Sequence, residues 1–282
     1  MNQLKSNRIF SFLIILIIYA LAIWLGIMIY QRLPYAYWLN LLLADIAATV
    51  FVFLFSLLFH NASVYDPYWS VQPIAILIAF ALKQSLTPIG ILILIAVWIW
   101  GIRLTANWAY TFHSLNHQDW RYTMLQERTG AGYPIINFIG IHLVPTLIVY
   151  ACTLPAVVVF VDGAELRWQS LPFILLSFCA VALQGTADWQ MHQFRKSHSE
   201  GFMRNGLWKN SRHPNYLGEI LMWWGIGLAS VMALGGKWYL LCGAVANTLL
   251  FLFVSIPLAD QHQARKPGFD AYKEETHALR LW

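Results

Sequence analysis

Long apolar runs constrain this sequence more than any other feature. The first, IFSFLIILIIYALAIWLGIMIY at residues 9–30, contains no charged residue. About 20 apolar residues of α-helix cross a bilayer core about 30 Å thick, and inside lipid a helix satisfies its own backbone hydrogen bonds. The run is too long for the core of a signal peptide and has no small-residue cleavage site, so we expect it to stay in the mature chain as a membrane helix.

Similar runs recur along the chain. We expect membrane spans near residues 9–30, 39–60, 71–82, 88–112, 135–160, 170–193, 215–234 and 237–259. The third run is short, so it predicts either a partial span or a hairpin with the fourth. Only 11% of the 282 residues are charged and 59% are hydrophobic, whereas about 25% of a typical soluble domain is charged. The sequence therefore predicts an all-α fold, a polytopic transmembrane helix bundle of seven to eight spans that forms one membrane domain over residues 1–282.

The lysines and arginines lie mainly in segments that would share one side of the membrane. With eight spans, these segments are the N-terminus, the loops 61–70, 113–134 and 194–214, and the tail from residue 260. Loops rich in Lys and Arg stay in the cytoplasm, so we expect a cytoplasmic C-terminus. If residues 71–82 do not cross, the N-terminus moves to the other side, but the C-terminal half keeps its orientation.

The densest polar cluster, NSRHPNYLGE at residues 210–219, lies where an apolar run begins. Pro214 suits the first turn of a helix, because its missing N–H is not needed there. The N-terminus of a helix favours an anion, and Arg212 and His213 add positive charge directly before it. Basic residues beside a span are common in membrane proteins, so these two alone are a weak signal.

Asn215 and Glu219 are the unusual members of this cluster. They are four residues apart and share one face of the expected helix, and Trp223 continues that face after four more residues. A carboxylate about one turn inside a bilayer is costly and needs a partner or a ligand. We therefore expect a binding site on this face.

Two further segments carry ionisable groups near the same membrane surface. In ADWQMHQFRK, Asp188, His192 and Arg195 share one helix face; the alternative is a local ion pair at a helix end. The tail LADQHQARKPGFDAYKEETHALRLW is mixed in charge, and the alternative there is a solvated tail. Together, basic groups for phosphates, polar groups for an amide or sugar and an apolar interior predict a phosphorylated nucleotide cofactor and a lipophilic substrate. The sequence has no GxGxxG turn and no H-E-x-x-H motif, so we expect neither a Rossmann domain nor a metal site.

GLWKNSRHPNYLGE, followed by FDAYKE in the tail, resembles the C-terminal region of the steroid 5α-reductase family. DPYWSVQP, GIRLTANW and DWRY resemble a bacterial branch of that family, catalogued as a domain of unknown function. The resemblance covers residues 60–282 and leaves residues 1–35 as an extra N-terminal span. It implies an NADPH-dependent reductase of the bacterial inner membrane that transfers hydride to a conjugated C=C bond of a lipophilic substrate.

The resemblance also implies where the cofactor binds. Asn215 and Glu219 are expected at the nicotinamide half of NADPH, and Asp188 and Arg195 at its ribose and phosphate portion. Arginine suits phosphate because it makes paired hydrogen bonds. The expected cofactor-binding residues are Arg103, Arg121, Asp188, Arg195, Arg204, Arg212, His213, Asn215, Tyr216, Glu219, His262, Arg265 and Tyr272.

The groups that polarise the substrate carbonyl depart from the family pattern. The steroid enzymes use a glutamate and a tyrosine; the segment that matches the glutamate contains Asp66, with Gln72 as the other candidate. The segment that matches the tyrosine contains Trp98 and Trp100, and an indole cannot supply a proton at neutral pH. The expected catalytic residues are Asp66 in its protonated form, Tyr65 and Tyr110, and the expected substrate contacts are Trp69, Trp100 and Trp223.

The sequence leaves the substrate and two other activities open. Steroids, isoprenoids, quinones and fatty enones all fit an apolar interior, and we expect no nucleic-acid partner. One alternative is an S-adenosylmethionine-dependent methyltransferase related to the isoprenylcysteine carboxyl methyltransferases, which share an RHPxYxG motif. Glu219 favours the reductase, whereas Glu274 and Glu275 in the tail keep the methyltransferase open. A transporter is the other alternative, because Asp45 and His142 lie inside expected spans.

Overall fold

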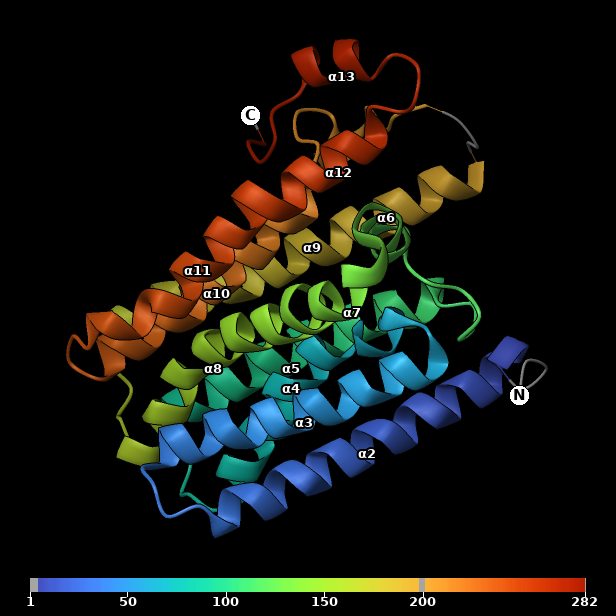
Figure 1. The fold of residues 1–282 in the computed structure, drawn as a ribbon. Helices are drawn as coiled ribbons and strands as arrows, with labels where there is room; N and C mark the ends of the chain where they lie inside the picture. The colour runs from blue at the N-terminus through green and yellow to red at the C-terminus, as the bar shows by residue number, and fades with distance from the viewer. Residues whose placement is uncertain (1–4, 198–200, 282) are drawn as a thin grey trace. The chain divides into compact units, whose positions relative to one another are not determined.

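The computed structural model describes residues 5–197 and 201–281, and its regular elements in these ranges are all helices (Figure 1). An isolated bridge joins Ser211 to His277. Seven helical segments are long and apolar enough to cross a membrane. The expectation of an all-α, polytopic membrane bundle is therefore confirmed.

The helices follow the apolar runs of the sequence. The α-helices are α2 (Arg8–Arg32), α3 (Tyr37–Phe59), α4 (Tyr68–Ala81), α5 (Pro88–Thr111), α6 (Trp120–Thr129), α7 (Tyr133–Ile136), α8 (Val144–Asp162), α9 (Leu171–Ser197), α10 (Pro214–Ala233), α11 (Cys242–Leu250), α12 (Ile256–Gln263) and α13 (Phe269–Glu275). Two π-helical segments, Asn137–Leu143 and Phe251–Ser255, carry α7 into α8 and α11 into α12.

Helix α4, at the third apolar run, is only 14 residues long. At 1.5 Å per residue it measures about 21 Å, which is less than a bilayer core of about 30 Å. The loop before it is folded inward, because Val64 and Tyr65 are buried and Tyr19 of α2 donates a hydrogen bond to the carbonyl of Val64 at 2.8 Å. Because this loop is buried among the helices, α4 starts within the bundle. The helix that follows the loop is therefore shorter than a full membrane span.

The chain packs into two compact units. Unit 1 runs to Ala79 and resumes with Gly101–Tyr150, and unit 2 consists of Phe80–Trp100 and Ala151–Trp282. Helix α5 contributes to both, because the division falls within it. The single membrane domain expected over residues 1–282 stays a prediction.

Close packing of α9 against α10 organises unit 2. A Cβ atom on Gly218 would lie 2.8 Å from the carbonyl oxygen of Ala180, and one on Gly225 would lie 2.7 Å from that of Phe173. Only glycine allows the two backbones to approach this closely, as is common between membrane helices. This contact brings the polar end of α9 beside the start of α10.

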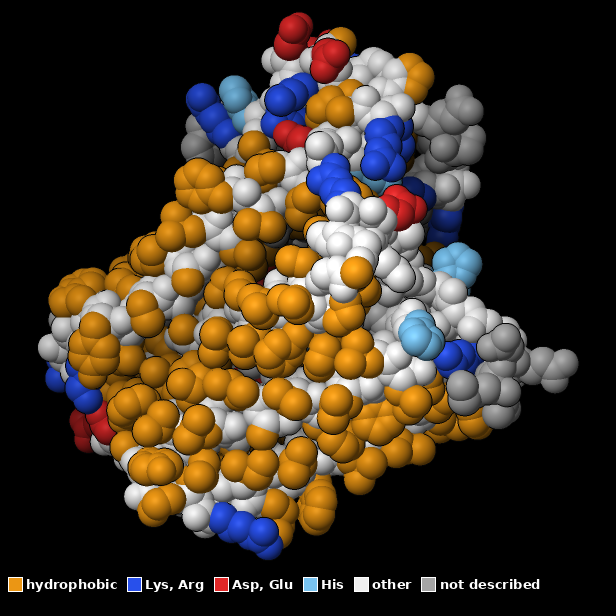
Figure 2. All heavy atoms as spheres, viewed as in Figure 1, with side chains coloured by type: hydrophobic (Ala, Val, Ile, Leu, Met, Phe, Trp, Pro, Cys, Tyr) orange, Lys and Arg blue, Asp and Glu red, His pale blue; other side chains and the backbone are white. Residues whose placement is uncertain are grey.

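The surface of the molecule is largely apolar. Figure 2 shows hydrophobic side chains over most of the visible face, whereas Lys, Arg, Asp and Glu gather near α13. Large side chains such as Ile9 and Phe253 are 72% exposed on helices of membrane-spanning length. Such a surface belongs in lipid, so the chain is an integral membrane protein associated with the bilayer.

Candidate functional site

Asp66 lies in the wall of a cavity in unit 1, between the loop before α4, the end of α5 and the segment that enters α6. The cavity has a volume of about 290 Å³, and its lining includes Trp69, Asn107, Trp108 and Arg121. Asp66, Trp69 and Arg121 were expected as a catalytic, a substrate-binding and a cofactor-binding residue. The structure places all three around one space.

Tyr122 and Asp66 form a phenol–carboxyl pair at this wall. The hydroxyl of Tyr122 donates a hydrogen bond to Oδ1 of Asp66 at 2.6 Å. Asp119 positions the pair: its side chain caps α6 by accepting from the N–H of Arg121 at 2.9 Å, and its own N–H donates to Oγ of Ser63 at 2.9 Å. The start of α6 is thereby joined to the loop that carries Asp66.

Burial raises the pKa of Asp66 from 3.8 to about 7. The positive charge of Arg121 opposes this rise, while the negative charge of Asp119 adds to it. Arg121 is itself paired with Asp119, with Nε 2.8 Å from Oδ1. A carboxyl group with a pKa near 7 can hold a proton at neutral pH and also release it, as a general acid must.

The two tyrosines expected as catalytic groups lie elsewhere in unit 1. Tyr65 is 2% exposed, and its hydroxyl shares a hydrogen bond with Oγ1 of Thr146 at 2.8 Å. Tyr110 is 55% exposed near the end of α5. Arg103, on the same helix, is half-buried. The roles assigned to these residues stay predictions.

Arg212 and His213 are buried and bound to Asp260 in unit 2. Nη2 and Nε of Arg212 donate to the two carboxylate oxygens of Asp260 at 3.0 and 3.3 Å, and Nε2 of His213 lies 2.9 Å from Oδ1. Nη1 of Arg212 donates to the carbonyl of Thr276 at 2.5 Å. The guanidinium group thus joins the start of α10 to α12 and to the tail, which uses most of its hydrogen-bonding capacity.

The part of the tail that the structure describes packs against the segment 210–219, so it is not a solvated tail. The N–H of Arg212 donates to the carbonyl of His277 at 2.8 Å, and the N–H of His277 donates to the carbonyl of Asn210 at 2.8 Å. Tyr272 of α13 is buried and stacks on Phe202, with ring centroids 4.7 Å apart. The motif, the loop before it and the tail therefore form one structure.

Glu219 is a buried carboxylate held by two indole groups. It is 5% exposed, and its oxygens accept from Nε1 of Trp100 at 2.8 Å and from Nε1 of Trp223 at 3.0 Å. Both tryptophans are fully buried, and their rings meet edge to face with centroids 4.9 Å apart. Because an indole N–H only donates, the carboxyl oxygens accept both hydrogen bonds, which orients the group.

The amide of Asn215 lies one turn before Glu219 and reaches α9. Its Nδ2 donates to Oδ1 of Asp188 at 3.4 Å. Tyr216 stacks on the ring of His213 with centroids 5.0 Å apart. Asp188 and Asn215 were expected to act on one cofactor, and the structure brings their side chains together.

The remaining cationic candidates lie at the surface of unit 2. The guanidinium groups of Arg195 and Arg265 are exposed and form no hydrogen bond or ion pair with a residue that the structure describes. Arg204 is paired with Glu275 and lies over the ring of Tyr272. His262 is half-buried in α12. Of the arginines expected at the cofactor, Arg195 and Arg265 are therefore the two whose charge no described residue pairs.

Sequence reasoning missed the roles of Tyr122 and Asp260 and the hydrogen bond that Trp100 makes. Tyr122 lies in the DWRY motif, which was noted without a role for its tyrosine. Asp260 opens the polar part of the tail, yet only the structure identifies it as the partner of Arg212. The side chain of Trp100 was expected at the substrate, whereas its N–H is used by Glu219.

One comparison with known proteins identifies a family, and none of them identifies an activity. The family model described as "Protein of unknown function (DUF1295)" matches residues 52–276. A Schizosaccharomyces pombe protein called uncharacterized protein C594.04c is 24% identical over 192 residues, which cover 58% of this chain and 56% of that relative. The match thus spans little more than half of the relative's length. No solved structure matches the chain.

Proposed function

We propose that this chain, which belongs to the DUF1295 family, is a membrane-embedded, NADPH-dependent reductase. It transfers hydride to a conjugated C=C bond of a lipophilic substrate. Steroids, isoprenoids, quinones and fatty enones belong to the substrate class. The proposal places the protein in the bacterial inner membrane with its C-terminus in the cytoplasm. The resemblance to steroid 5α-reductases supports both the reaction and the cofactor.

The pair formed by Tyr122 and Asp66 is the observation that carries the proposal. Reduction of an enone puts negative charge on the carbonyl oxygen, and a positioned acid stabilises that charge and then protonates it. The 2.6 Å hydrogen bond orients the pair, and burial keeps a proton available on Asp66 near neutral pH. Trp69 supplies an apolar wall to the same cavity.

The donor set of unit 2 fits a dinucleotide phosphate. Arg195 and Arg265 would bind its phosphates, because their guanidinium groups are exposed and have no partner among the described residues. Arg204 is less suited, because Glu275 already compensates its charge. Asn215 and Glu219 would bind its carboxamide, since they offer an amide and a fixed carboxylate one turn apart. Arg212 is less suited, because Asp260 already compensates its charge. NADPH, when bound, supplies the hydride.

Tryptophan fluorescence tests the cofactor, because the chain has 14 tryptophans and three of them were expected to line the site. We expect NADPH to quench this emission and to accept energy from it, whereas S-adenosylmethionine does neither. Glu219→Gln and Arg195→Ala should each weaken NADPH binding about tenfold or more, because hydrogen bonds to charged groups contribute about 1.5–3 kcal/mol.

Arg167→Ala is the matched control for Arg195→Ala. Both arginines flank α9, Arg167 before its first turn and Arg195 in its last turn. The control should leave the affinity for NADPH unchanged. Equal affinity for NADPH in all three variants and the unmodified protein would contradict the proposed binding site. The absence of any fluorescence response to NADPH would contradict the proposed cofactor.

The ion pair between Arg204 and Glu275 favours a second candidate function. Membrane methyltransferases with an RHPxYxG motif carry an arginine–glutamate pair in the tail. Here Glu275 of the tail is paired with an arginine, although Arg204 lies in the loop before α10. A fluorescence response to S-adenosylmethionine but not to NADPH would select the methyltransferase.

A further inference from the structure

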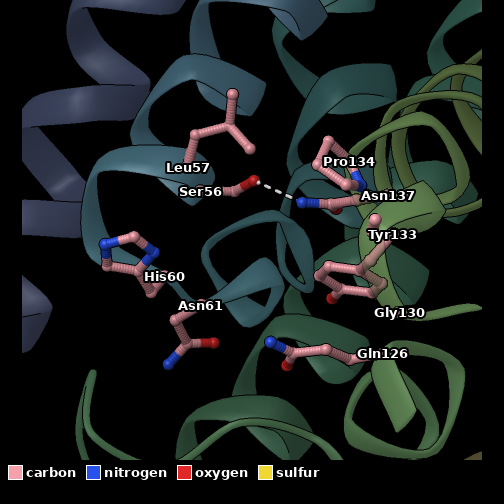
Figure 3. Close-up of a pocket in the computed structure, with 10 residues that line it drawn as sticks. Ser56, Leu57, His60, Asn61, Gln126, Gly130, Tyr133, Pro134 and Asn137 are labelled. Atoms are coloured by element: carbon pink, nitrogen blue, oxygen red, sulfur yellow. Dashed lines mark hydrogen bonds between the residues drawn. The ribbon is translucent and has the colours of Figure 1, made fainter.

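A second cavity of about 290 Å³ lies in unit 1 and shares no lining residue with the cavity at Asp66. Figure 3 shows the lining side chains around one space, with Ser56 of α3 directed at Asn137. The volume far exceeds the roughly 30 Å³ that one water molecule occupies in the liquid. The cavity therefore has room for part of an organic molecule.

Two buried polar atoms at this cavity lack a partner among the residues that the structure describes. They are Oδ1 of Asn137 and the hydroxyl oxygen of Tyr133. Asn137 is 2% exposed, and its Nδ2 donates to Oγ of Ser56 at 3.0 Å. If the amide were turned over, Ser56 would donate to Oδ1 and the NH₂ group would be left instead. In either orientation one end of the amide is unsatisfied, which is costly in a buried site.

The backbone at Asn137 is also unusual. This residue begins the π-helical segment Asn137–Leu143, and its carbonyl lies 3.0 Å from Nδ1 of His142. Such segments occur frequently at functional sites, because the wider turn presents side chains that a regular α-helix would not. The π-turn and the unsatisfied amide coincide at one residue.

The chemistry of the lining selects a neutral ligand. The residues around the cavity include no Asp, Glu, Lys or Arg. A hydroxyl group both donates and accepts, so it can satisfy Asn137 in either orientation and can also bond to Tyr133. A phosphate or an ammonium group would bring a charge that no Lys, Arg, Asp or Glu of the lining balances.

The cavity lies at the end of a membrane-spanning helix, and this position favours an amphiphilic ligand over a free polyol. Ser56 and Leu57 belong to the last turn of α3, a helix of membrane-spanning length, and the chain leaves the helix at His60. Leu57 is 37% exposed and the adjacent Leu58 is 55% exposed, so apolar surface lies next to the polar cavity. A hydroxyl head group would enter the cavity while its chain stays on that surface.

We propose that this cavity is a binding site for the hydroxyl head group of a neutral lipid of the acylglycerol type. The site is separate from the Asp66 cavity and does not depend on the reductase function.

Photolabelling in vesicles tests the site. The full chain is reconstituted in phosphatidylcholine vesicles that contain a 1-acylglycerol with a diazirine in its acyl chain, and labelled peptides are identified by mass spectrometry. We expect labelling of the segments around residues 56–61 and 130–137. Asn137→Leu and Tyr133→Phe should each lower it about threefold to tenfold, because each removes a buried hydrogen bond.

Asn247→Leu provides the matched control. Asn247 is 4% exposed, its Nδ2 has no partner among the described residues, and it lines neither cavity. The control should keep full labelling. Tyr133→Phe removes a single oxygen and keeps the ring, so it separates loss of binding from loss of folding.

Four outcomes would overturn the proposal. Labelling that stays unchanged in both cavity variants would mean lipid contact without a head-group site. Equal labelling by the methyl ester that carries the same acyl chain would mean that the site does not recognise the hydroxyl groups. Displacement by free glycerol would assign the cavity to a soluble polyol. Absence of labelling would mean that the cavity holds only water.

Discussion

Replacing Asp260 by alanine should destabilise the protein more than replacing any exposed acidic residue. Asp260 holds two buried basic side chains: Arg212 is 9% exposed and His213 is 7% exposed. Asp260→Ala removes the hydrogen bonds of 3.0 and 3.3 Å to Arg212 and the contact of 2.9 Å to His213. The guanidinium group keeps only the carbonyl oxygens of Thr276 and Lys273.

The magnitude follows from the burial of the pair. Removal of one partner from a buried ion pair costs about 3–5 kcal/mol, because the other charge stays buried without compensation. The side chain of Asp260 is 14% exposed and Arg212 keeps two carbonyl acceptors, so we take the lower end, about 3 kcal/mol. At about 1.4 kcal/mol for each factor of ten, this loss raises the unfolding equilibrium constant more than a hundredfold.

Equilibrium unfolding by sodium dodecyl sulfate in mixed micelles, followed by tryptophan emission, measures this loss. The control is Asp162→Ala, which removes the carboxylate from Lys237 at 2.6 Å. That pair is 39% and 37% exposed, so its loss should cost no more than about 1 kcal/mol. The double variant Arg212→Leu/Asp260→Ala should lose less than the sum of its single substitutions, because it leaves no buried guanidinium group without its carboxylate.

A small effect of Asp260→Ala would refute this reasoning. If the free energy of unfolding changes no more than in Asp162→Ala, Arg212 is not held by Asp260 in the membrane. Arg212 would then be available to an anion, as the sequence suggested.

Two further predictions concern Asp66 and the close contact between α9 and α10. The pKa of Asp66 is raised in the folded state, so the folded state binds this proton more tightly, and the free energy of unfolding should fall as pH rises from about 4 to about 7. Asp66→Asn should flatten that slope in the same unfolding assay; an unchanged slope would place the titration on another group. Gly225→Ala should cost about 1–3 kcal/mol, because the new Cβ would lie 2.7 Å from the carbonyl of Phe173. Gly140→Ala, whose nearest neighbour would be 3.9 Å away, should change little, and equal effects would argue against the close contact.

The membrane bundle was readable from the sequence because each span depends on local composition. Twenty apolar residues in a row have few alternatives to a helix in lipid, wherever the rest of the chain lies. For the same reason the first turn of α10 was predictable from Pro214, and the shared face of Asn215 and Glu219 from their spacing. The short α4 was foreseen as unusual, but its cause, the inward fold of the loop before it, was not.

The partners of the polar residues were decided only by the tertiary structure. Trp100 and Glu219 are 119 residues apart, and Tyr122 lies 56 residues from Asp66. The sequence placed carboxylates in costly surroundings, which established that each needs a partner, but many tryptophans and tyrosines could have met that need. Which one does so depends on how the helices pack, and packing is set by side-chain contacts between distant segments that no local pattern records.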